Sequence, residues 1–307
     1  MAISLALTCC HHGVRQHTAD PSPAAAPAAA ASPREQTDVT LTTTAGHPLE
    51  DGAAYGVGIV VVADFSRPVA DRAAAQRRLT VTTSPRVAGA WDWVDDHTAH
   101  WRPQRYYAPN TTVLVDARIS GVDLGGGNYG RADAVASFRI GASHVSVADD
   151  RTHMIAVSKN GKLVRTIPTS MGMRGSETVN GRTIVFRTPP GVYTVLDKAD
   201  PIVMDSSTFG LPVHSRLGYR RTVRWATRLS EDGIFVHEND ASGWAQGHSN
   251  VTHGCLNVNQ DNGKWFYAFS VPGDVVEVRH TEGPPLTVRN NGDWTVPWKT
   301  WLAGSAQ

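Results

Sequence analysis

One short segment of the chain gathers three histidines and a cysteine, which are side chains able to do nucleophilic chemistry. Residues 234–257 read IFVHENDASGWAQGHSNVTHGCLN and contain His237, His248, His253 and Cys255. A cysteine attacks a carbonyl carbon as its thiolate, so it needs a nearby imidazole to accept the thiol proton and then to protonate the departing amine. The segment therefore indicates a cysteine–histidine catalytic site.

The spacing within the segment favours two of the histidines over the third. A two-residue separation puts His253 and Cys255 on one side of an extended chain, and a strand that ends at His237 presents a second imidazole from across a sheet. Gly254 permits tight backbone geometry, so the backbone amides around it are predicted to converge on an oxyanion. Nothing pairs His248 with the thiol by spacing, and we interpret it as structural.

The elements predicted around this segment are mostly short strands. Two strands are expected to form a hairpin about Asn160-Gly161, the favoured pair of residues for a two-residue turn. The part of the chain predicted as the catalytic domain, residues 144–280, is therefore mainly β with one short helix. Its predicted strands are 154–158, 163–167, 183–186, 191–196, 234–237 and 274–279, and its predicted helix is 259–269.

An earlier block, residues 37–143, is predicted to form a separate domain. Turn residues divide about 100 residues into about seven short alternating segments, which is typical of an immunoglobulin-like sandwich. The block lacks the cysteine pair that joins the two sheets of antibody domains, so the similarity is one of architecture. The alternating segments include 38–43, 58–65, 79–83, 98–101, 112–119 and 134–140, with a helical turn expected at 71–78.

The last 27 residues, 281–307, are predicted to form a tail that packs on the catalytic domain. Trp294, Trp298 and Trp301 are spaced to share one helical face, with Pro297 in the first turn. Three tryptophans on a solvated tail would be costly, so we expect them to be covered. The predicted fold class is thus mainly β: an immunoglobulin-like sandwich, then a β-rich catalytic domain with a short helix and a tryptophan-containing tail.

Length and charge limit the classes of partner. The 307 residues suit two domains with linkers. Lys and Arg number 29 against 28 Asp and Glu, and a net charge of +1 provides no field to recruit nucleic acid, which we exclude as a partner. No apolar run approaches the ~20 residues that span a bilayer.

The first 36 residues are predicted to be a signal remnant and a linker. Residues 1–8 are mostly apolar and lead into Cys9 and Cys10, which resembles the end of a secretory signal followed by a lipid-attachment cysteine. Residues 21–33 read PSPAAAPAAAASP, which is typical of an extended spacer. We expect an exported, monomeric protein of the cell envelope, anchored by an N-terminal lipid; the alternative for these residues is a disordered tail.

The run THGCLN at residues 252–257, with His237 eighteen residues before Cys255, resembles the signature of L,D-transpeptidases. That family joins peptidoglycan stem peptides through a cysteine thioester. Its mycobacterial members carry immunoglobulin-like domains before a YkuD-like catalytic domain, so the resemblance extends from about residue 38 to the end of the chain. Other segments that resemble the mycobacterial members are MDSSTFG (204–210), GYR (218–220), WAT (225–227), AQGH (245–248), GDW (292–294) and PW (297–298).

The resemblance implies catalytic roles position by position. Cys255 matches the nucleophile and His237 the general base, whose imidazole is oriented by the backbone carbonyl of the next residue, here Glu238. Mycobacterial relatives usually have a small residue at that position, but a carbonyl can act beneath any side chain. His253 matches a histidine beside the thiol that supports the oxyanion or the substrate, together with the Gly254 backbone amide.

The resemblance also implies substrate-binding positions. Asp232 and Gly233 match a backbone pair that lines the donor groove, while Met204 belongs to a flap over the pocket. Tyr219 is expected to contact substrate, although it could equally be a flap residue that makes one hydrogen bond. Asn257 and Thr252 complete the implied set, with Thr252 in place of a commoner serine. Four flap arginines either meet stem carboxylates or form a solvated face, and these are Arg216, Arg220, Arg221 and Arg224.

The implied reaction cross-links the third residues of two peptidoglycan tetrapeptide stems and releases the terminal D-alanine of the donor. It needs neither a metal nor an organic cofactor. Water as the acceptor would make the protein an L,D-carboxypeptidase, and an amine on another protein would make it an attachment enzyme. Carbapenem β-lactams are expected to acylate the thiol.

Two hypotheses from other classes compete with this one. In the first, His237, His253 and Cys255 bind zinc with His248 or water, although only the pair at 253 and 255 has the close spacing of zinc signatures. In the second, the chain is a silent module that binds the cell wall through its first domain. An intact set of cysteine and histidines argues against that second hypothesis.

Overall fold

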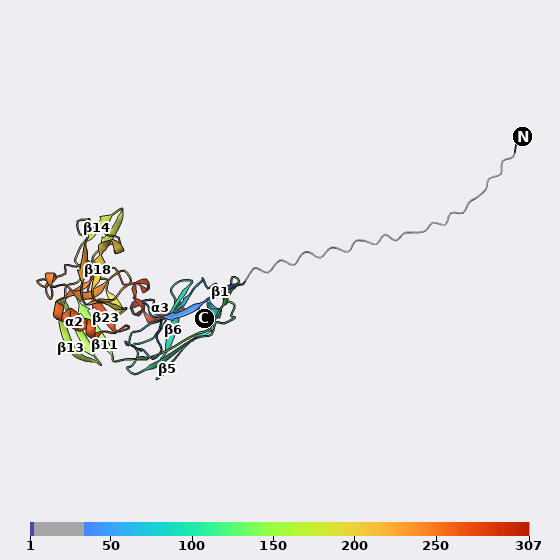
Figure 1. Ribbon diagram of the computed structural model, residues 1–307, viewed down its shortest axis with the longest axis horizontal. Helices are drawn as coiled ribbons and strands as arrows, with labels where there is room; N and C mark the ends of the chain where they lie inside the picture. The colour runs from blue at the N-terminus through green and yellow to red at the C-terminus, as the bar shows by residue number, and fades with distance from the viewer. Residues whose placement is uncertain (3–33, 307) are drawn as a thin grey trace. The chain divides into compact units, whose positions relative to one another are not determined.

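The computed structural model describes residues 1–2 and 34–306 (Figure 1). The predicted spacer and the two cysteines considered for lipid attachment lie outside the described residues. Within the described part of the chain, no helix has both the length and the apolar character needed to cross a membrane.

The first domain is a sandwich of two four-stranded sheets. Strand β8 (Thr112–Ala117) shows the alternation that buries one face, because Val113, Val115 and Ala117 are buried while Leu114 is exposed. One sheet has the order β2 (Val39–Thr42), β4 (Val61–Phe65), β7 (Thr98–Pro103), β6 (Gly89–Trp93). The other has the order β3 (Ala54–Tyr55), β10 (Ala134–Ile140), β8 (Thr112–Ala117), β5 (Leu79–Ser84).

Two smaller elements complete the first domain. Strand β1 (Glu35–Thr37) pairs in parallel with β9 (Asn128–Gly130). Helix α1 (Arg72–Gln76) forms within the predicted turn, and the Asp71 side chain caps it by accepting from the Ala74 amide.

A five-stranded sheet forms the base of the catalytic domain. Its order is β13 (Lys162–Pro168), β12 (Met154–Lys159), β11 (His144–Asp149), β23 (Val275–Arg279), β16 (Gly191–Thr194). The predicted hairpin joins β12 to β13, with φ of 50° at Asn160 and 76° at Gly161, as a two-residue turn between twisted strands requires.

A second sheet carries the chemically interesting segment. Its order is β17 (Lys198–Ala199), β20 (Ala226–Arg228), β21 (Phe235–Glu238), β22 (Leu256–Val258). Helix α2 (Gln260–Phe269) follows β22, begins at an Asn259 cap and contributes the buried Phe266. The two sheets and α2 enclose one apolar core, to which Val236, Leu256 and Val278 belong. The core fixes the relative positions of β21 and β22.

The flap predicted over the pocket is built mainly from one hairpin. Strand β18 (Ile202–Asp205) pairs antiparallel with β19 (Arg220–Val223), and the connection begins with the 3₁₀ helix η1 (Ser206–Phe209). A second hairpin, β14 (Ser176–Val179) with β15 (Arg182–Val185), contacts the flap, because the Leu217 amide donates to Glu177 Oε2 at 3.2 Å. In Figure 1, β14 and β18 appear together, away from β11 and β13.

The tail contacts both domains. The 3₁₀ helices η3 (Val288–Asn290) and η4 (Asp293–Thr295) lead to helix α3 (Trp298–Ala303). The tail contacts the catalytic domain, where Thr295 Oγ1 accepts from the Val192 amide at 2.8 Å. The tail also contacts the first domain, which the sequence did not suggest. There Trp301 is fully buried and its indole donates to the Ala90 carbonyl at 2.9 Å.

The three tail tryptophans do not share one helix, because the chain is extended at Val296 and Pro297 caps α3. They meet instead around the buried guanidinium of Arg102, whose Cζ lies 4.8, 5.3 and 4.5 Å from the rings of Trp294, Trp298 and Trp301. Arg102 also donates to the Val296 carbonyl at 2.7 Å. The three rings, which were expected to pack on the catalytic domain, thus contact a cation of the first domain.

Candidate active site

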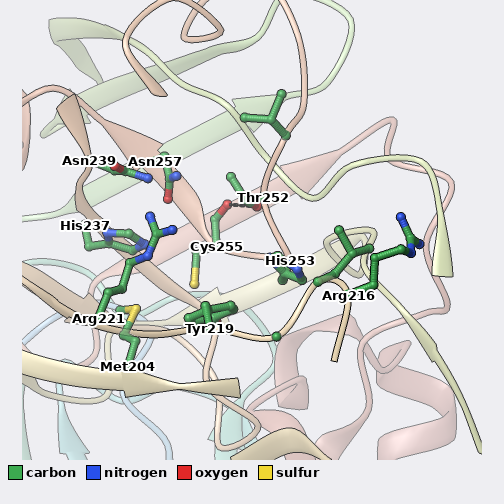
Figure 2. A pocket seen from close by; sticks show the side chains of 13 residues that line it. Met204, Arg216, Tyr219, Arg221, His237, Asn239, Thr252, His253, Cys255 and Asn257 are labelled. Atoms are coloured by element: carbon green, nitrogen blue, oxygen red, sulfur yellow. Dashed lines mark hydrogen bonds between the residues drawn. The ribbon is translucent and has the colours of Figure 1, made fainter. Parts of the chain in front are cut away.

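Cys255 lies immediately before β22 and is buried, with 8% of its surface exposed. Its Sγ is 3.6 Å from the backbone oxygen of Gly233, to which the thiol donates a weak hydrogen bond. The thiol nevertheless lines a cavity that opens under the flap, and Figure 2 shows its sulfur at the centre of the surrounding side chains. A buried sulfur that faces a cavity is protected from solvent but accessible to a bound substrate.

Two hydroxyls hold the turn that presents the cysteine. Thr252 Oγ1 accepts from the Gly254 amide at 3.0 Å and donates to the Cys255 carbonyl at 2.7 Å. Thr188 Oγ1 donates to the Gly254 carbonyl at 2.8 Å and accepts from the Gly172 amide. Gly254 has φ of 132°, in the region that side chains disfavour. The Gly254 amide, predicted to face an oxyanion, is therefore engaged by Thr252 in the resting site.

His237 is delivered to the same cavity by β21. The parallel pairing of β21 with β22 places His237 opposite Asn257. Its Nδ1 lies 2.7 Å from the backbone oxygen of Glu238. Since a carbonyl can only accept, Nδ1 carries the proton and Nε2 is left as the basic nitrogen. The Glu238 side chain accepts a hydrogen bond from the Asp240 amide at 3.1 Å. The contact with His237 Nδ1 is therefore made by the Glu238 backbone and not by its carboxylate.

Burial keeps both reactive groups neutral at rest. It lowers the pKa of His237 to about 4 and raises the pKa of the Cys255 thiol to about 11. At neutral pH the site therefore holds a thiol and a neutral imidazole rather than a thiolate–imidazolium pair. Proton transfer must accompany the attack of sulfur on the substrate.

His253 and Tyr219 form the opposite wall of the cavity. Their ring centroids are 5.0 Å apart, and His253 also packs edge-on against Phe186 at 4.6 Å. His253 Nε2 is buried and has no hydrogen-bond partner among the described residues. Burial raises the pKa of Tyr219, with the neighbouring Cys255 as a smaller cause, so the Tyr219 hydroxyl keeps its proton. Tyr219 is thus a donor beside the sulfur.

Asn257 and Asn239 line the cavity together with His237, and the short helix η2 (Asp240–Ser242) follows Asn239. Asn257 Nδ2 lies 3.3 Å from Ser242 Oγ, and Ser242 Oγ donates to the Asn239 carbonyl at 3.0 Å. The Asn257 Oδ1 atom is buried without a hydrogen-bond partner among the described residues. The loop between the histidine and the cysteine is therefore fixed by side-chain hydrogen bonds, and Asn239 joins the cavity wall. His248 is exposed and lines neither this cavity nor the next.

A second cavity also reaches Cys255. It shares Tyr219, His253 and Cys255 with the first and adds the turn at Asp232 and Gly233. The Asp232 carboxylate accepts from Asn290 Nδ2 at 2.9 Å. The predicted site residues thus divide between two cavities that meet at the sulfur: His237, Met204, Asn257 and Thr252 line one, while Asp232, Gly233 and Gly254 line the other.

The four flap arginines also divide into two pairs. Arg220 and Arg224 form ion pairs with Asp205 at 2.6 Å and with Asp200 at 3.0 Å, outside the cavity. Arg216 and Arg221 line the cavity that contains His237.

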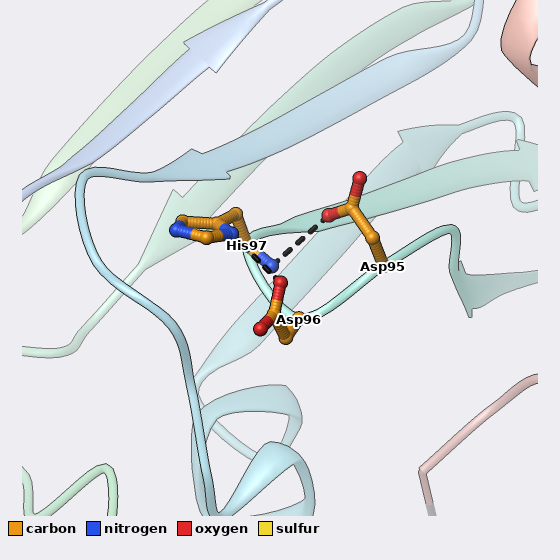
Figure 3. Close-up of side chains that lie close together, drawn as sticks. All are labelled: Asp95, Asp96 and His97. Carbon is orange, nitrogen blue, oxygen red and sulfur yellow. Dashed lines mark hydrogen bonds and ion pairs between the residues drawn. The ribbon is translucent and has the colours of Figure 1, made fainter.

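The zinc hypothesis finds no supporting geometry. Among the described residues, one group of three side chains brings potential ligand atoms within 4.8 Å of one another, and it consists of Asp95, Asp96 and His97 in the first domain (Figure 3). Asp95 Oδ1 in that group already accepts from the backbone amides of His97 and Thr98 at 3.0 Å, as in an ordinary turn. The donor atoms of His237, His253 and Cys255 do not converge in this way.

Sequence reasoning missed several residues of the site. Thr188 supports the cysteine turn from 66 positions earlier, and Ser242 connects Asn239 with Asn257. Neither has a motif, because an isolated hydroxyl in a sequence says nothing about which backbone atoms it will meet. The sequence also did not show that Arg221 lines the cavity while Arg220 lies outside it, because this depends on the pairing of β19 with β18.

Comparisons with known proteins agree with this architecture. Residues 24–123 match the bacterial Ig domain family, and residues 143–278 match the L,D-transpeptidase catalytic domain family. The chain is 42% identical over 258 residues to L,D-transpeptidase 2 of Mycobacterium tuberculosis, covering 84% of this chain and 61% of that protein. It is 32% identical to L,D-transpeptidase 1 of the same species, covering 78% of this chain and 90% of that one.

Solved structures give the same result. An L,D-transpeptidase from Mycobacterium smegmatis is 32% identical, with a TM-score of 0.60 over 78% of this chain and 99% of that one. The protein in the structure of LD transpeptidase LdtMt1 in complex with imipenem is 34% identical in sequence, with a TM-score of 0.63 over 75% of this chain and 95% of that one. The fold and site are those of a two-domain protein with a cysteine–histidine catalytic unit. The chain belongs to the L,D-transpeptidase family, although it spans only about three fifths of the length of L,D-transpeptidase 2.

The family and the fold class predicted from the sequence are thereby confirmed, including the immunoglobulin-like nature of the first domain. The domain boundaries at residues 36, 143 and 280 stay predictions.

Proposed function

We propose that this protein is an L,D-transpeptidase that cross-links the third residues of peptidoglycan stem peptides through a thioester on Cys255. The observation that carries the proposal is the meeting of Cys255 and His237 in one cavity, with Nδ1 of His237 bound to the Glu238 carbonyl. That contact directs the basic Nε2 of the imidazole away from the backbone and toward the space where a substrate would lie.

The first half-reaction forms the thioester. As Cys255 Sγ attacks the carbonyl carbon of the third stem residue, its proton passes to His237 Nε2. The C–N bond to the terminal D-alanine then breaks, and His237 returns the proton to the departing amine. The neutral resting pair suits this sequence, because charge develops only when substrate is present. The Tyr219 hydroxyl is proposed as a donor to the developing oxyanion, since the Gly254 amide is occupied, and His253 is proposed to contact the substrate beside it.

The second half-reaction transfers the acyl group. The side-chain amine of the third residue of another stem attacks the thioester carbon, the S–C bond breaks, and His237 carries the amine proton back to sulfur. Two cavities that meet at Cys255 support this proposal, because the donor stem and the acceptor amine must approach one carbonyl carbon from different sides. We assign the cavity at Asp232 and Gly233 to the first three residues of the donor stem, as the family resemblance implies for the donor groove. The fourth residue then extends past the sulfur into the His237 cavity, which the acceptor amine enters after D-alanine has left.

Incubation of the protein with tetrapeptide stems, followed by mass spectrometry of the products, tests the proposal. Wild type should release D-alanine and form a dimer linked between third residues, whereas Cys255→Ala should do neither while remaining folded by circular dichroism. Release of D-alanine by the variant would refute the assignment of the nucleophile. A tripeptide without dimer would identify a carboxypeptidase, and product linked only to an added protein amine would identify an attachment enzyme.

Acylation by carbapenems provides an independent test of the nucleophile. We propose that such β-lactams open on Cys255, because their strained amide presents the same kind of carbonyl to the thiol. Intact-protein mass should show one adduct that is absent in Cys255→Ala and retained in Cys9→Ser and Cys10→Ser. An adduct that persists without Cys255 would contradict the proposal.

We further propose that the protein is exported and works as a monomer in the cell envelope, where its stem-peptide substrates are. Lipid attachment at Cys9 or Cys10 rests on the sequence alone. Cell fractionation with and without globomycin-type inhibition of lipoprotein processing would test the anchor, and a protein that stays in the cytoplasmic fraction would refute export.

A further inference from the structure

The cavity around His237 has an unbalanced charge. Among the described residues that line it, two are arginines, Arg216 and Arg221, and none is an aspartate or glutamate. Figure 2 shows the Arg221 side chain beside His237 and directed toward the middle of the site, whereas Arg216 lies beyond His253 with its guanidinium turned outward. Arg221 is therefore the cation that a ligand next to the sulfur would meet.

Strand alternation explains why Arg221 and its neighbour have different environments. In the pairing of β18 with β19, Met204 lies opposite Arg221 and Asp205 lies opposite Arg220. Successive side chains of a strand point to opposite faces, so Met204 and Arg221 face the cavity while Asp205 and Arg220 face away. The outward pair forms an ion pair at 2.6 Å, and the inward arginine has no acidic partner across the hairpin.

One contact and two electrostatic effects show that the Arg221 charge lies near the reacting groups. Its Cζ lies 5.6 Å from the ring centroid of Tyr219, over the ring face. After burial as the main cause, its charge also helps to lower the pKa of both His237 and His253. No hydrogen bond or ion pair from the Arg221 side chain occurs within the described residues. The guanidinium is thus positioned by stacking, with its hydrogen-bond donors unused.

We propose that Arg221 binds a free carboxylate of the stem peptide and so makes the site selective for anionic donor stems. The inference rests on the proposed function and adds a specificity residue to it. Guanidinium donors are arranged to bind the two oxygens of a carboxylate, and the cavity supplies no internal acid to compete. The terminal carboxylate of the stem lies one residue beyond the carbonyl that Cys255 attacks, a Cα–Cα step of about 3.8 Å.

Two carboxylates of a stem could bind to the Arg221 guanidinium in this way. One is the C-terminal carboxylate of the fourth residue, and the other is the side-chain carboxylate of a diamino acid at the third residue. Both are close to the attacked carbonyl, so the test must neutralise each of them separately. A primary amide removes the charge and changes the shape little.

The experiment compares three synthetic tetrapeptide stems: one with both carboxylates, one with a C-terminal amide and one with a third-residue side-chain amide. Release of the fourth residue is followed by mass spectrometry for wild type, Arg221→Gln, Arg221→Lys and Arg220→Gln. Arg220→Gln is the matched control, because it removes an equal charge from the adjacent residue on the outer face. Binding of the three stems to Cys255→Ala, with and without Arg221→Gln, is measured by calorimetry.

Arg221→Gln should lower kcat/KM for the doubly charged stem about tenfold, which corresponds to one charged hydrogen-bonding contact. For one of the two amidated stems, Arg221→Gln should leave kcat/KM unchanged, because that stem lacks the carboxylate that Arg221 binds. The identity of that stem shows which carboxylate is bound. Arg221→Lys should recover part of the loss, and Arg220→Gln should match wild type. Equal losses for all three stems, or no loss, would overturn the inference.

The binding measurement separates this inference from the proposed function. If stems bind Cys255→Ala with an Arg221-dependent preference for the carboxylate but no D-alanine is ever released by wild type, the proposed function fails and the inference holds. If wild type cross-links stems without regard to Arg221, the function holds and the inference fails. Absence of stem binding at any ligand concentration tested would overturn the inference as well.

Discussion

His237 lies opposite Asn257 in the parallel pairing of β21 with β22, which brings the imidazole and the cysteine turn together although eighteen residues separate them. Partners in parallel strands present their side chains on the same face of the sheet. Cys255 is two residues before Asn257, so it faces the same side. One register of two short strands therefore assembles the base, the nucleophile and the cavity wall.

Replacing His237 by Gln should slow acylation of Cys255 by a carbapenem about 10²–10⁴-fold at pH 7, the usual contribution of a general base. Because burial raises the thiol pKa to about 11, the variant rate should then rise about tenfold per pH unit from pH 7 to 9 as thiolate forms directly. Stopped-flow absorbance measures the acylation rate at pH 7 and its dependence on pH. The exposed His248→Gln variant should behave as wild type, and a variant rate independent of pH would contradict the assigned role.

Stability should fall as the pH falls from 6.5 toward 4. The pKa of His237 is lowered from 6.5 to about 4 in the folded protein, so in this window the unfolded chain binds a proton that the folded chain does not. The loss should reach about 2–3 kcal/mol at pH 4.5. Urea denaturation of wild type and His237→Gln at pH 7 and 4.5 isolates the contribution of His237 to the free energy of unfolding, because the two proteins contain the same carboxylates. Parallel losses in the two proteins would show that His237 is not the cause.

Thr252→Val should slow acylation and destabilise the fold by about 1–3 kcal/mol, because the Gly254 amide and the Cys255 carbonyl would both lose a buried partner. The shape of the side chain is kept, so a lost hydroxyl is the only large change. Thr252→Ser retains the hydroxyl and should keep most of the rate. Equal rates for the valine and serine variants, measured with the same carbapenem, would argue that the turn holds without this hydroxyl.

Trp301→Ala should lower the free energy of unfolding by about 3–5 kcal/mol, since it empties a fully buried site between the tail and the first domain. The neighbouring Leu302 is 44% exposed, and Leu302→Ala should cost only about 0.5 kcal/mol or less. Chemical denaturation of both variants provides the comparison. A small effect of Trp301→Ala would mean that the tail contributes little to the folded state.

The sequence predicted much of the local structure because local rules decide it. The hairpin at Asn160-Gly161 formed because that pair readily adopts positive φ, and α2 began at Asn259 because its side chain caps the Asn262 amide. The THGCLN run also identified the family, since it contains residues whose chemistry depends on one another. The roles of the individual site residues remain predictions that the experiments above address.

Other features depend on contacts between distant segments, which no local pattern contains. Thr188 meets Gly254 and the tail tryptophans meet Arg102 only after the sheets have packed. Amino-acid type and spacing determined by themselves that this chain holds a cysteine–histidine site on a mainly β scaffold. The tertiary structure alone decided that the Gly254 amide is occupied, that both reactive groups are neutral and that Arg221, not Arg220, faces the sulfur. Burial and strand register set these properties, and both arise only when the whole chain folds.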